Sequence, residues 1–210
     1  QEAGYFQREI VPVPVARWSE TRDAAAAEFA RDETIRPGTL ASKLAALQPS
    51  FRPEGGRLTA GTSSQISDGA AALLLMDADT AARRGLRARA RIVAMATVGS
   101  DATLMLTGPM AATRRVLQKA GLTPGDIDLF EVNEAFACVP LAWQRELEVP
   151  SEQLNVNGGA IALGHPLGAT GARIMTSLLH ELERRGARRG LQAICCGGGM
   201  ATATIIERLP

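Results

Sequence analysis

Three short clusters in the second half of the chain contain the residue types that proton transfer needs. Residues 133–137 read Asn-Glu-Ala-Phe-Ala, residues 157–171 hold five glycines around His165, and residues 195–199 read Cys-Cys-Gly-Gly-Gly. An imidazole or a thiol can give and take protons, and the bare N–H groups of a glycine turn can polarise an oxygen. The set is therefore suited to acid–base chemistry at a polarised oxygen.

Each cluster also has a structural interpretation. Asn133 is a good helix N-cap, and Glu134 favours the positive end of a helix dipole. A lone histidine is more often structural than catalytic, although His165 stands in a rigid Gly-His-Pro turn. The glycines could cradle a phosphate, but the Lys-Ser/Thr ending and the strand–GxGxxG–helix order are both missing. Cys195 could be a buried thiol before a hairpin turn. Adjacent cysteines chelate one tetrahedral metal poorly, so we expect no metal site.

The elements that must position these clusters alternate along the second half of the chain. Continuous apolar runs predict strands, and apolar positions on one helical face predict helices. This alternation favours a layered α/β fold. Residues 1–66 are rich in Pro and Gly, so we expect them to be irregular apart from one short helix. The predicted strands are 70–76, 90–98, 127–132, 154–156, 191–195 and 200–206, and the predicted helices are 23–31, 79–84, 108–120, 134–147 and 169–185.

Composition excludes several classes of protein. The 210 residues carry 23 Lys and Arg against 22 Asp and Glu, a net charge of +1 that gives no drive toward nucleic acid or an anionic membrane. No apolar run reaches the roughly 18 residues of a membrane helix. Three cysteines make no extracellular disulfide framework, so we expect a reducing cytoplasm. The chain begins with Gln1 and not with Met, so either the residues before it were removed or the chain is a piece of a longer one.

Taken together and in this order, the three clusters resemble the thiolase family. Residues 59–71, Thr-Ala-Gly-Thr-Ser-Ser-Gln-Ile-Ser-Asp-Gly-Ala-Ala, extend the likeness upstream, so that it covers essentially the whole chain. The sequence Ser-Ser-Gln at residues 63–65 is more similar to degradative 3-ketoacyl-CoA thiolases than to biosynthetic acetoacetyl-CoA thiolases. Residues 105–109 and the Thr-Ile-Ile-Glu-Arg-Leu ending further resemble actinobacterial thiolases of steroid degradation.

The resemblance implies the thiolase fold, a layered αβαβα sandwich of mixed sheets, with only its C-terminal half present. Residues 1–66 would be part of the loop domain that binds CoA. Residues 67–87 would be the last strand and helix of the N-terminal domain, and residues 88–210 the C-terminal domain. The implied partners are the N-terminal half of the same enzyme and further copies in a homodimer or homotetramer.

The implied activity is thiolytic cleavage of a 3-ketoacyl-CoA to acetyl-CoA or propionyl-CoA and a shortened acyl-CoA, or the reverse Claisen condensation. A cysteine in the N-terminal half would take the acyl group. His165 would activate that cysteine, and Asn133 would hold the water of a first oxyanion hole. Cys195 would move the proton to or from C2, and the N–H of Gly197 would form half of a second oxyanion hole.

For coenzyme A, which is a substrate and not a cofactor, the resemblance implies contacts along the loop domain. Ser64 would contact the pantetheine and Arg36 the adenine-nucleotide end, and the tunnel would be lined by Phe51, Ala60, Ala135 and Phe136. The sequence departs from the commonest family pattern at Gln65, Cys196 and Ala201.

Two rival interpretations remain open at this point. A ketosynthase-type condensing enzyme shares the fold, but it has His or Asn where the thiolase has its second cysteine, and Cys195 argues against it. A non-catalytic CoA-binding or scaffold subunit fits the missing nucleophile. Cys138 does not replace that nucleophile, since it lies in the helix predicted after Asn133.

Overall fold

One mixed four-stranded sheet forms the centre of the molecule in the computed structural model, which describes residues 1–15 and 27–210. The strands lie in the order β3 (Ala90–Gly99), β6 (Met200–Arg208), β5 (Arg189–Cys196) and β4 (Leu129–Val132). The pairs β3–β6 and β6–β5 are antiparallel, whereas β5–β4 is parallel. These four strands confirm four of the strands predicted from the apolar runs, and the mixed sheet is the kind that the resemblance implies.

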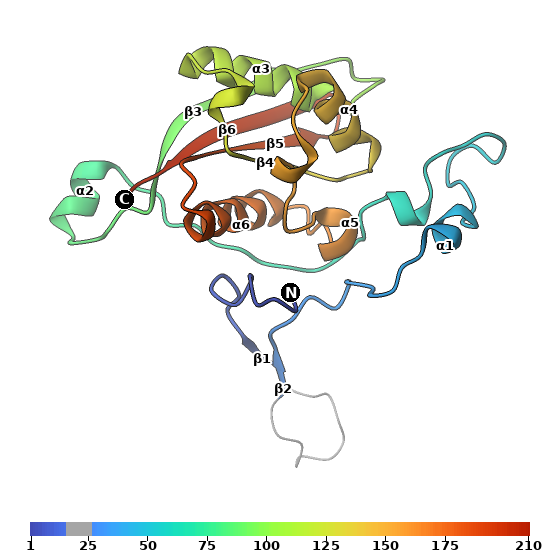
Figure 1. Ribbon diagram of the computed structural model, residues 1–210, viewed down its shortest axis with the longest axis horizontal. Helices are drawn as coiled ribbons and strands as arrows, with labels where there is room; N and C mark the ends of the chain where they lie inside the picture. The colour runs from blue at the N-terminus through green and yellow to red at the C-terminus, as the bar shows by residue number, and fades with distance from the viewer. Residues whose placement is uncertain (16–26) are drawn as a thin grey trace.

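Helices cover both faces of this sheet (Figure 1). Helices α3 (Gly108–Ala120) and α4 (Cys138–Leu147) lie on one face, and α6 (Thr170–Arg185) lies on the other, next to the short α5 (Ala160–Leu163). The predicted helices 108–120 and 169–185 are therefore confirmed to within one residue. Both end where a glycine, Gly121 or Gly186, adopts the left-handed conformation that glycine tolerates.

The core lies between the sheet and these helices. Trp143 of α4 is fully buried, and its Nε1 donates a hydrogen bond of 2.8 Å to Oγ1 of Thr113 on α3. The Trp143 ring also packs on Phe130 of β4, with the ring centroids 5.2 Å apart. On the other face, Leu178 and Leu182 of α6 form a second cluster with the sheet. The strand ends that bear the candidate residues are thus held from both sides.

The N-terminal part has little regular structure, as expected. It contains β1 (Val13–Val15) paired with β2 (Ala27–Phe29), α1 (Ala41–Ala45) and the 3₁₀ helix η1 (Ala60–Thr62). The helix predicted at 23–31 is wrong over residues 27–29, which pair as a strand, and its residues 23–26 lie outside the described part. Helix α2 (Ala78–Arg83) confirms the short helix predicted before Gly85.

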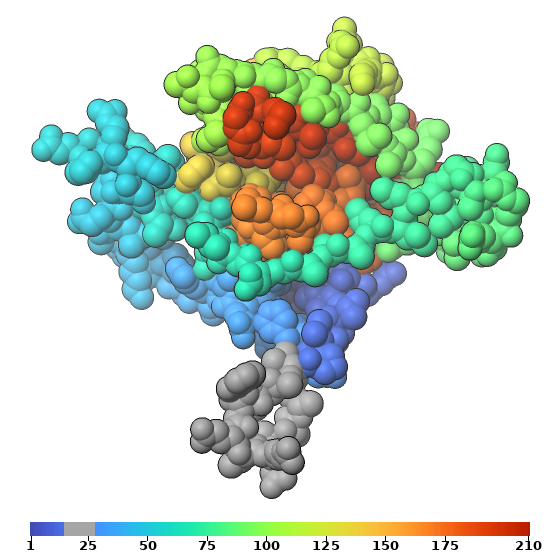
Figure 2. Space-filling view, turned by 180° about the vertical axis from the view of Figure 1, so that it is seen from behind, coloured from blue at the N-terminus to red at the C-terminus, as the bar shows by residue number. Residues whose placement is uncertain are grey.

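Residues 70–76 do not form the predicted buried strand in the 210-residue chain. These residues are extended but have no strand beside them in the described chain, and all of them are exposed. Leu74 and Leu75 are 78% and 69% exposed. In Figure 2 the segment runs as a teal band across the surface. Its apolar sequence fits a buried strand, but burial needs a neighbouring strand, and the described residues supply none.

Two smaller predictions need correction. The helix predicted at 134–147 begins only at Cys138, because Phe136 pairs instead with Ser63 in an antiparallel bridge. The strand predicted at 154–156 is reduced to a single bridge between Leu154 and Phe130. The remaining short elements are the 3₁₀ helices η2 (Pro124–Asp126) and η3 (Ser151–Gln153).

Candidate active site

Asn133 and His165 meet at the end of β4. The backbone N–H of Asn133 donates to the carbonyl of Ala193 on β5 at 3.0 Å, which fixes the residue directly after the strand. Its side chain is buried, with Nδ2 3.2 Å from Nε2 of His165. The N-cap interpretation of Asn133 is wrong, since the N-cap of α4 is Ala137. Among residues 1–15 and 27–210, Oδ1 of Asn133 has no hydrogen-bond partner.

His165 is held on two further sides. Its Nδ1 lies 2.7 Å from Oγ1 of Thr170, and its backbone N–H donates to the carbonyl of Gln65 at 3.0 Å. Burial lowers the pKa of His165, and the positive charge of Arg173 lowers it further. The imidazole is therefore neutral near pH 7, the form in which it can accept a proton.

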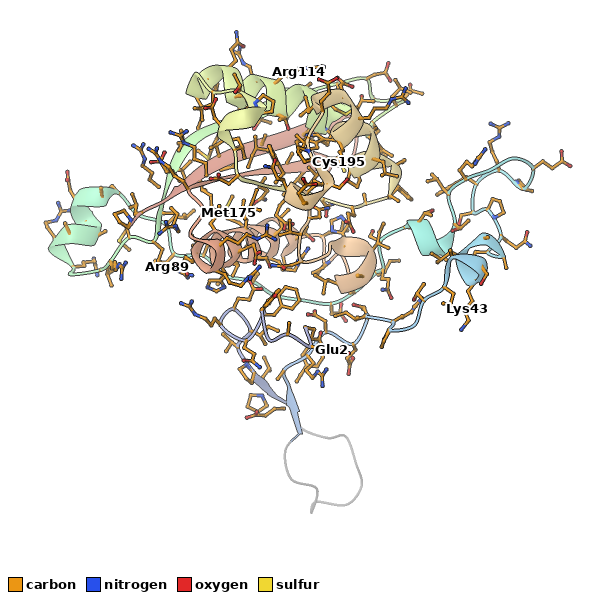
Figure 3. All side chains as sticks on the ribbon, in the orientation of Figure 1. Glu2, Lys43, Arg89, Arg114, Met175 and Cys195 are labelled. Carbon is orange, nitrogen blue, oxygen red and sulfur yellow. The ribbon has the colours of Figure 1, made fainter. Side chains whose placement is uncertain are left out.

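Cys195 lies at the same edge of the sheet as Asn133. Strands β4 and β5 are parallel, with Val132 beside Ala193, so their carboxyl ends meet at one edge. Cys195, which is labelled in Figure 3, follows Ala193 by two residues and is half-buried. Burial raises the pKa of its thiol. Cys195 is thus protonated near pH 7, which suits a proton donor better than a resting nucleophile.

The triple-glycine turn continues directly from these cysteines into β6. Gly197 is exposed, with open space where a side chain would lie. The turn is fixed from the side by Ser100, whose N–H and Oγ donate to the carbonyl of Gly199 at 2.6 and 2.8 Å. A Cβ on Gly199 would lie 2.7 Å from the Ser100 carbonyl, so the close approach requires glycine. Sequence reasoning missed Ser100.

A network around Glu134 joins the end of β4 to the stretch before His165. The Glu134 carboxylate accepts from Nδ2 of Asn155 at 2.8 Å and from the N–H of Ile161 at 3.1 Å. Asn155 also pairs with both backbone groups of Val132, at 2.8 and 2.9 Å. A Cβ on Gly159 would lie 2.2 Å from Cδ of Glu134. The glycine required here was visible in the sequence, but its partner was not.

The residues proposed for CoA form two groups. In the first, Ser64 donates through its N–H to the carbonyl of Ala135 at 3.0 Å, and the ring of Phe51 meets that of Phe136 edge-on at 6.1 Å. Ala60 begins η1 and is exposed. Phe51 and Ser64 thus bring the N-terminal part of the chain against residues 135–136.

Arg36 belongs to the second group, which is organised by Gln65. The Gln65 side-chain oxygen accepts from Nη2 of Arg36 at 3.2 Å, and its Nε2 donates to the carbonyls of Thr34 and Ile161, both at 3.1 Å. Because the Gln65 backbone also holds His165, one residue connects the segment of Arg36 with the imidazole loop. Gln65 was noticed in the sequence only as a departure from the family pattern.

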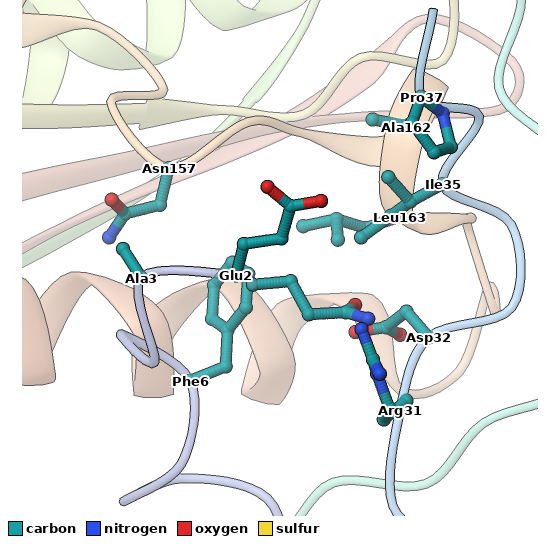
Figure 4. A pocket seen from close by; sticks show the side chains of 11 residues that line it. Glu2, Ala3, Phe6, Arg31, Asp32, Ile35, Pro37, Asn157, Ala162 and Leu163 are labelled. Atoms are coloured by element: carbon teal, nitrogen blue, oxygen red, sulfur yellow. The ribbon is translucent and has the colours of Figure 1, made fainter.

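Other features of the structure lie away from this edge. A cavity of about 560 Å³ opens between the first residues and the end of α5, lined among others by Glu2, Arg31, Asp32 and Asn157 (Figure 4). Asn133, His165 and Cys195 do not line it. Over residues 1–15 and 27–210, no group of three or more His, Cys, Asp or Glu side chains is placed to hold a metal ion. In the same residues, no helix is long and apolar enough to cross a membrane.

Family models for the N-terminal and C-terminal domains of thiolases match residues 1–79 and 86–208. The chain is 49% identical over 211 residues to the 3-ketoacyl-CoA thiolase of Cronobacter sakazakii, covering 99% of this chain and 54% of that protein. It is 51% identical over 207 residues to Steroid 3-ketoacyl-CoA thiolase FadA6 of Mycobacterium tuberculosis, covering 99% of this chain and 48% of that protein. The chain therefore spans about half the length of these relatives.

Solved structures of thiolases are also similar to this chain. The Bacillus anthracis acetyl-CoA acetyltransferase matches with a TM-score of 0.92 at 45% identity, covering 99% of this chain and 51% of that one. Human mitochondrial 3-ketoacyl-CoA thiolase in complex with CoA matches with a TM-score of 0.86 at 38% identity, covering 100% and 50%. The expected thiolase fold is thereby confirmed. With both domain models matched and the fold shared, the chain belongs to the thiolase family.

Proposed function

We propose that this chain is the C-terminal half of a thiolase, an acyltransferase that cleaves 3-ketoacyl-CoA with free CoA or runs the reverse Claisen condensation. The observation that carries the proposal is the contact of 3.2 Å between Nδ2 of Asn133 and Nε2 of His165, at the sheet edge where Cys195 is the last residue but one of β5. This edge combines a neutral imidazole, a protonated thiol and a glycine turn, which are the groups that the reaction needs.

In the first proposed step, a cysteine thiolate of the N-terminal half attacks C3 of the substrate. His165 takes the proton that leaves this cysteine, and it faces the oxygen of the new tetrahedral alkoxide together with a water held by Asn133. The C2–C3 bond then breaks, and its electron pair moves onto C2. Cys195 gives its proton to C2, while the N–H of Gly197 stabilises the enolate oxygen.

In the second step, the sulfur of free CoA attacks the acyl group, the thioester bond to the nucleophilic cysteine breaks, and this cysteine leaves as a thiolate beside the protonated His165. The Cys195 thiolate accepts the proton of the CoA thiol, so the acid of the first step is regenerated. The products are acetyl-CoA or propionyl-CoA and an acyl-CoA shortened by that unit. Atoms and charges balance without a metal or a further cofactor, and coenzyme A enters as a substrate.

For CoA itself, we propose Ser64 at the pantetheine and Arg36 near the adenine-nucleotide end, with Phe51, Ala60, Ala135 and Phe136 along the tunnel. Support comes from the packing of Ser64 and Phe51 on residues 135–136. The matched human thiolase is described in complex with CoA. Within this proposal, the acyl group comes from steroid degradation, which residues 105–109 and the likeness to a steroid thiolase support.

The proposed organisation follows the family. Residues 1–66 belong to the loop domain, residues 67–87 complete the N-terminal domain, and residues 88–210 form the C-terminal domain. The N-terminal half supplies the nucleophile, and the whole enzyme is a homodimer or homotetramer. We place it in the cytoplasm, a proposal that the three free cysteines support.

The test is His165→Ala in the complete thiolase, meaning this chain joined to the half that its relatives have. Loss of the base lowers kcat for acetoacetyl-CoA cleavage by roughly 10²–10⁴ or more. His180→Ala, the other histidine of the chain, is the matched control and keeps kcat. A loss below about tenfold with the fold intact contradicts the proposed role and makes His165 a structural residue, whereas no turnover in the unaltered complete protein would favour a CoA-binding subunit without catalysis.

A further inference from the structure

The hydroxyl of Thr170 is buried beside the imidazole of His165. Thr170 is 1% exposed and is the first residue of α6. Its Oγ1 has two neighbours, Nδ1 of His165 at 2.7 Å and the carbonyl of Pro166 at 3.0 Å. At such distances both neighbours are hydrogen-bonded to the hydroxyl, and no water is needed to satisfy it.

Counting protons assigns the roles in this chain of bonds. A hydroxyl has one hydrogen, and a carbonyl oxygen can only accept, so Thr170 donates its hydrogen to Pro166. Only lone pairs of Oγ1 then remain for His165, and Nδ1 must carry a hydrogen to form a bond of 2.7 Å. In the neutral ring this leaves the lone pair on Nε2, the nitrogen that faces the amide of Asn133.

We propose that Thr170 is a positioning residue that holds His165 in the Nδ1–H tautomer. The hydroxyl is fixed by the carbonyl of Pro166 in the turn that precedes α6, so it presents an acceptor to the ring at one place. Nε2 is thereby kept as the basic nitrogen, oriented toward the sheet edge with Cys195. The catalytic consequence rests on the proposed function, whereas the tautomer itself does not.

The same contacts also predict the orientation of Asn133. If Nε2 carries the lone pair, it accepts a hydrogen bond from Nδ2 of Asn133. The distance of 3.2 Å between these two atoms agrees with such a bond. Oδ1 of Asn133 is then the buried atom without a partner in the described part of the chain. The opposite tautomer would require Nε2 to donate, and the Asn133 amide would have to turn over to accept.

The experiment is a long-range ¹H–¹⁵N correlation spectrum of the 210-residue chain with ¹⁵N-labelled histidine. The chain contains only His165 and His180, so a His180→Gln variant assigns the signals. The spectrum distinguishes a protonated ring nitrogen from an unprotonated one. We expect Nδ1 of His165 to be protonated and Nε2 unprotonated near pH 7. A protonated Nε2 in the unaltered chain overturns the proposal without reference to any activity.

Substitutions of Thr170 provide a second test in the same spectrum. Thr170→Val keeps the shape and removes the acceptor, and it should give a mixture of both tautomers, whereas Thr170→Ser should retain the Nδ1–H form. The matched control is Thr176→Val, because Thr176 lies on the same helix and its Oγ1 donates the same kind of bond, 2.8 Å to the carbonyl of Ala172, while no hydrogen bond joins it to a histidine in the described residues. An unchanged tautomer in Thr170→Val contradicts the proposal.

In the complete thiolase, the same variants separate positioning from folding. Thr170→Val should lower kcat about tenfold, the equivalent of one hydrogen bond, and leave KM for CoA unchanged. Thr170→Ser restores kcat, and Thr176→Val does not change it. If the tautomer shifts as expected while kcat stays constant, Thr170 positions the ring but His165 is not the base, which overturns the proposed function alone.

Discussion

At the scale of single residues, two neighbouring cysteines differ in what they can do. Cys195 and Cys196 are consecutive residues of β5, and consecutive strand side chains point to opposite faces. Burial raises the pKa of Cys195 and keeps it a thiol. Only one of the two can point toward the site where Asn133 and His165 meet. Counting back from the triple-glycine turn, the likeness to thiolases makes Cys195 the acid/base position, and we propose it for that role.

We therefore expect Cys195→Ser to abolish carbon–carbon cleavage in the complete thiolase, because a hydroxyl is far too weak an acid to exchange protons with an enolate near neutral pH. Cys196→Ser is the matched control and keeps most of the activity. The measurements are acetoacetyl-CoA cleavage and exchange of the acetyl-CoA methyl protons into deuterated water. An inactive Cys196→Ser with normal exchange in Cys195→Ser would place the reacting thiol one residue later.

A second residue-scale prediction concerns Glu131, which is buried in the middle of β4. Burial raises its pKa to about 8, although the positive charge of Arg173 lowers it in part. The unfolded value is near 4.5, so folding favours the protonated form. The stability that this carboxyl contributes is complete below about pH 4.5 and is lost as the pH rises toward 8.

Glu131→Gln removes this titration at nearly constant size. We expect the variant to gain stability over the unaltered chain as the pH rises from 5 to 9, in urea unfolding followed by circular dichroism. Glu152→Gln, an exposed position, is the control and should show no such trend. A stability difference that is constant with pH would mean that Glu131 is charged in the folded state.

The sequence identified the reactive residue types at this scale but not their partners. His165, Asn133 and Cys195 stood out because their clusters follow apolar runs. The contacts from Thr170, Asn155 and Ser100 could not be predicted, since each joins the site across a turn or between distant segments. The sequence could not decide whether Asn133 is a helix N-cap or a site residue, because an asparagine between a strand and a helix fits both. Only its contact with the distant His165 separates the two interpretations.

At the scale of elements, the glycines around His165 have different constraints. Gly159 lies against the Glu134 carboxylate, with a Cβ–Cδ distance of 2.2 Å for an added methyl, whereas Gly168 has open space. A flexible carboxylate could usually move away. Here its two hydrogen bonds, to Asn155 and the N–H of Ile161, hold the end of β4 to α5.

Gly159→Ala should therefore destabilise the chain by about 1–3 kcal/mol, as overpacking does, and it should weaken the placement of Asn133 against His165. Gly168→Ala is the matched control in the same stretch and should be neutral or slightly stabilising. Urea unfolding of both variants checks the stabilities. If the two variants have equal free energies of unfolding, the hydrogen bonds of Glu134 rearrange without a loss of stability, and the prediction is wrong.

Helices and strands were predicted well where the signal lies within the element itself. The helices α3 and α6 carry their own signals, an apolar face and a glycine after the last turn. The segment 70–76 has an equally clear apolar signal, but a strand needs a neighbour. The start of α4 shifted to Cys138 because Ser63 and Ser64 pair with residues 135–136, a contact between segments some 70 residues apart.

At the scale of the whole molecule, the chemistry proposed for this edge lacks a nucleophile. The three cysteines are Cys138, exposed at the start of α4, and the pair Cys195 and Cys196. We expect the 210-residue chain alone to give a flat trace with acetoacetyl-CoA and CoA, followed by the loss of enolate absorbance. Turnover well above the protein-free control would show that one of these cysteines takes the acyl group.

The segment 70–76 offers the sharpest test of how this chain fits a larger enzyme. The thiolase N-terminal family model extends to residue 79, and the relatives are about twice as long as the chain. Leu74 and Leu75 are exposed although consecutive extended residues point to opposite faces. Both faces of the segment are thus uncovered, as they would be for a strand whose sheet lies in another part of the enzyme.

Leu74→Ala should therefore have different effects in two contexts. In the 210-residue chain, the side chain is exposed, and the change should alter stability by less than about 0.5 kcal/mol. In the complete thiolase, where we expect the strand to be buried, the same change should cost about 2–5 kcal/mol. Leu191→Ala is the control, because Leu191 is fully buried in β5 and should be costly in both. If Leu74→Ala stays neutral in the complete thiolase, the segment does not enter a sheet, and the assignment of residues 67–87 to the N-terminal domain fails.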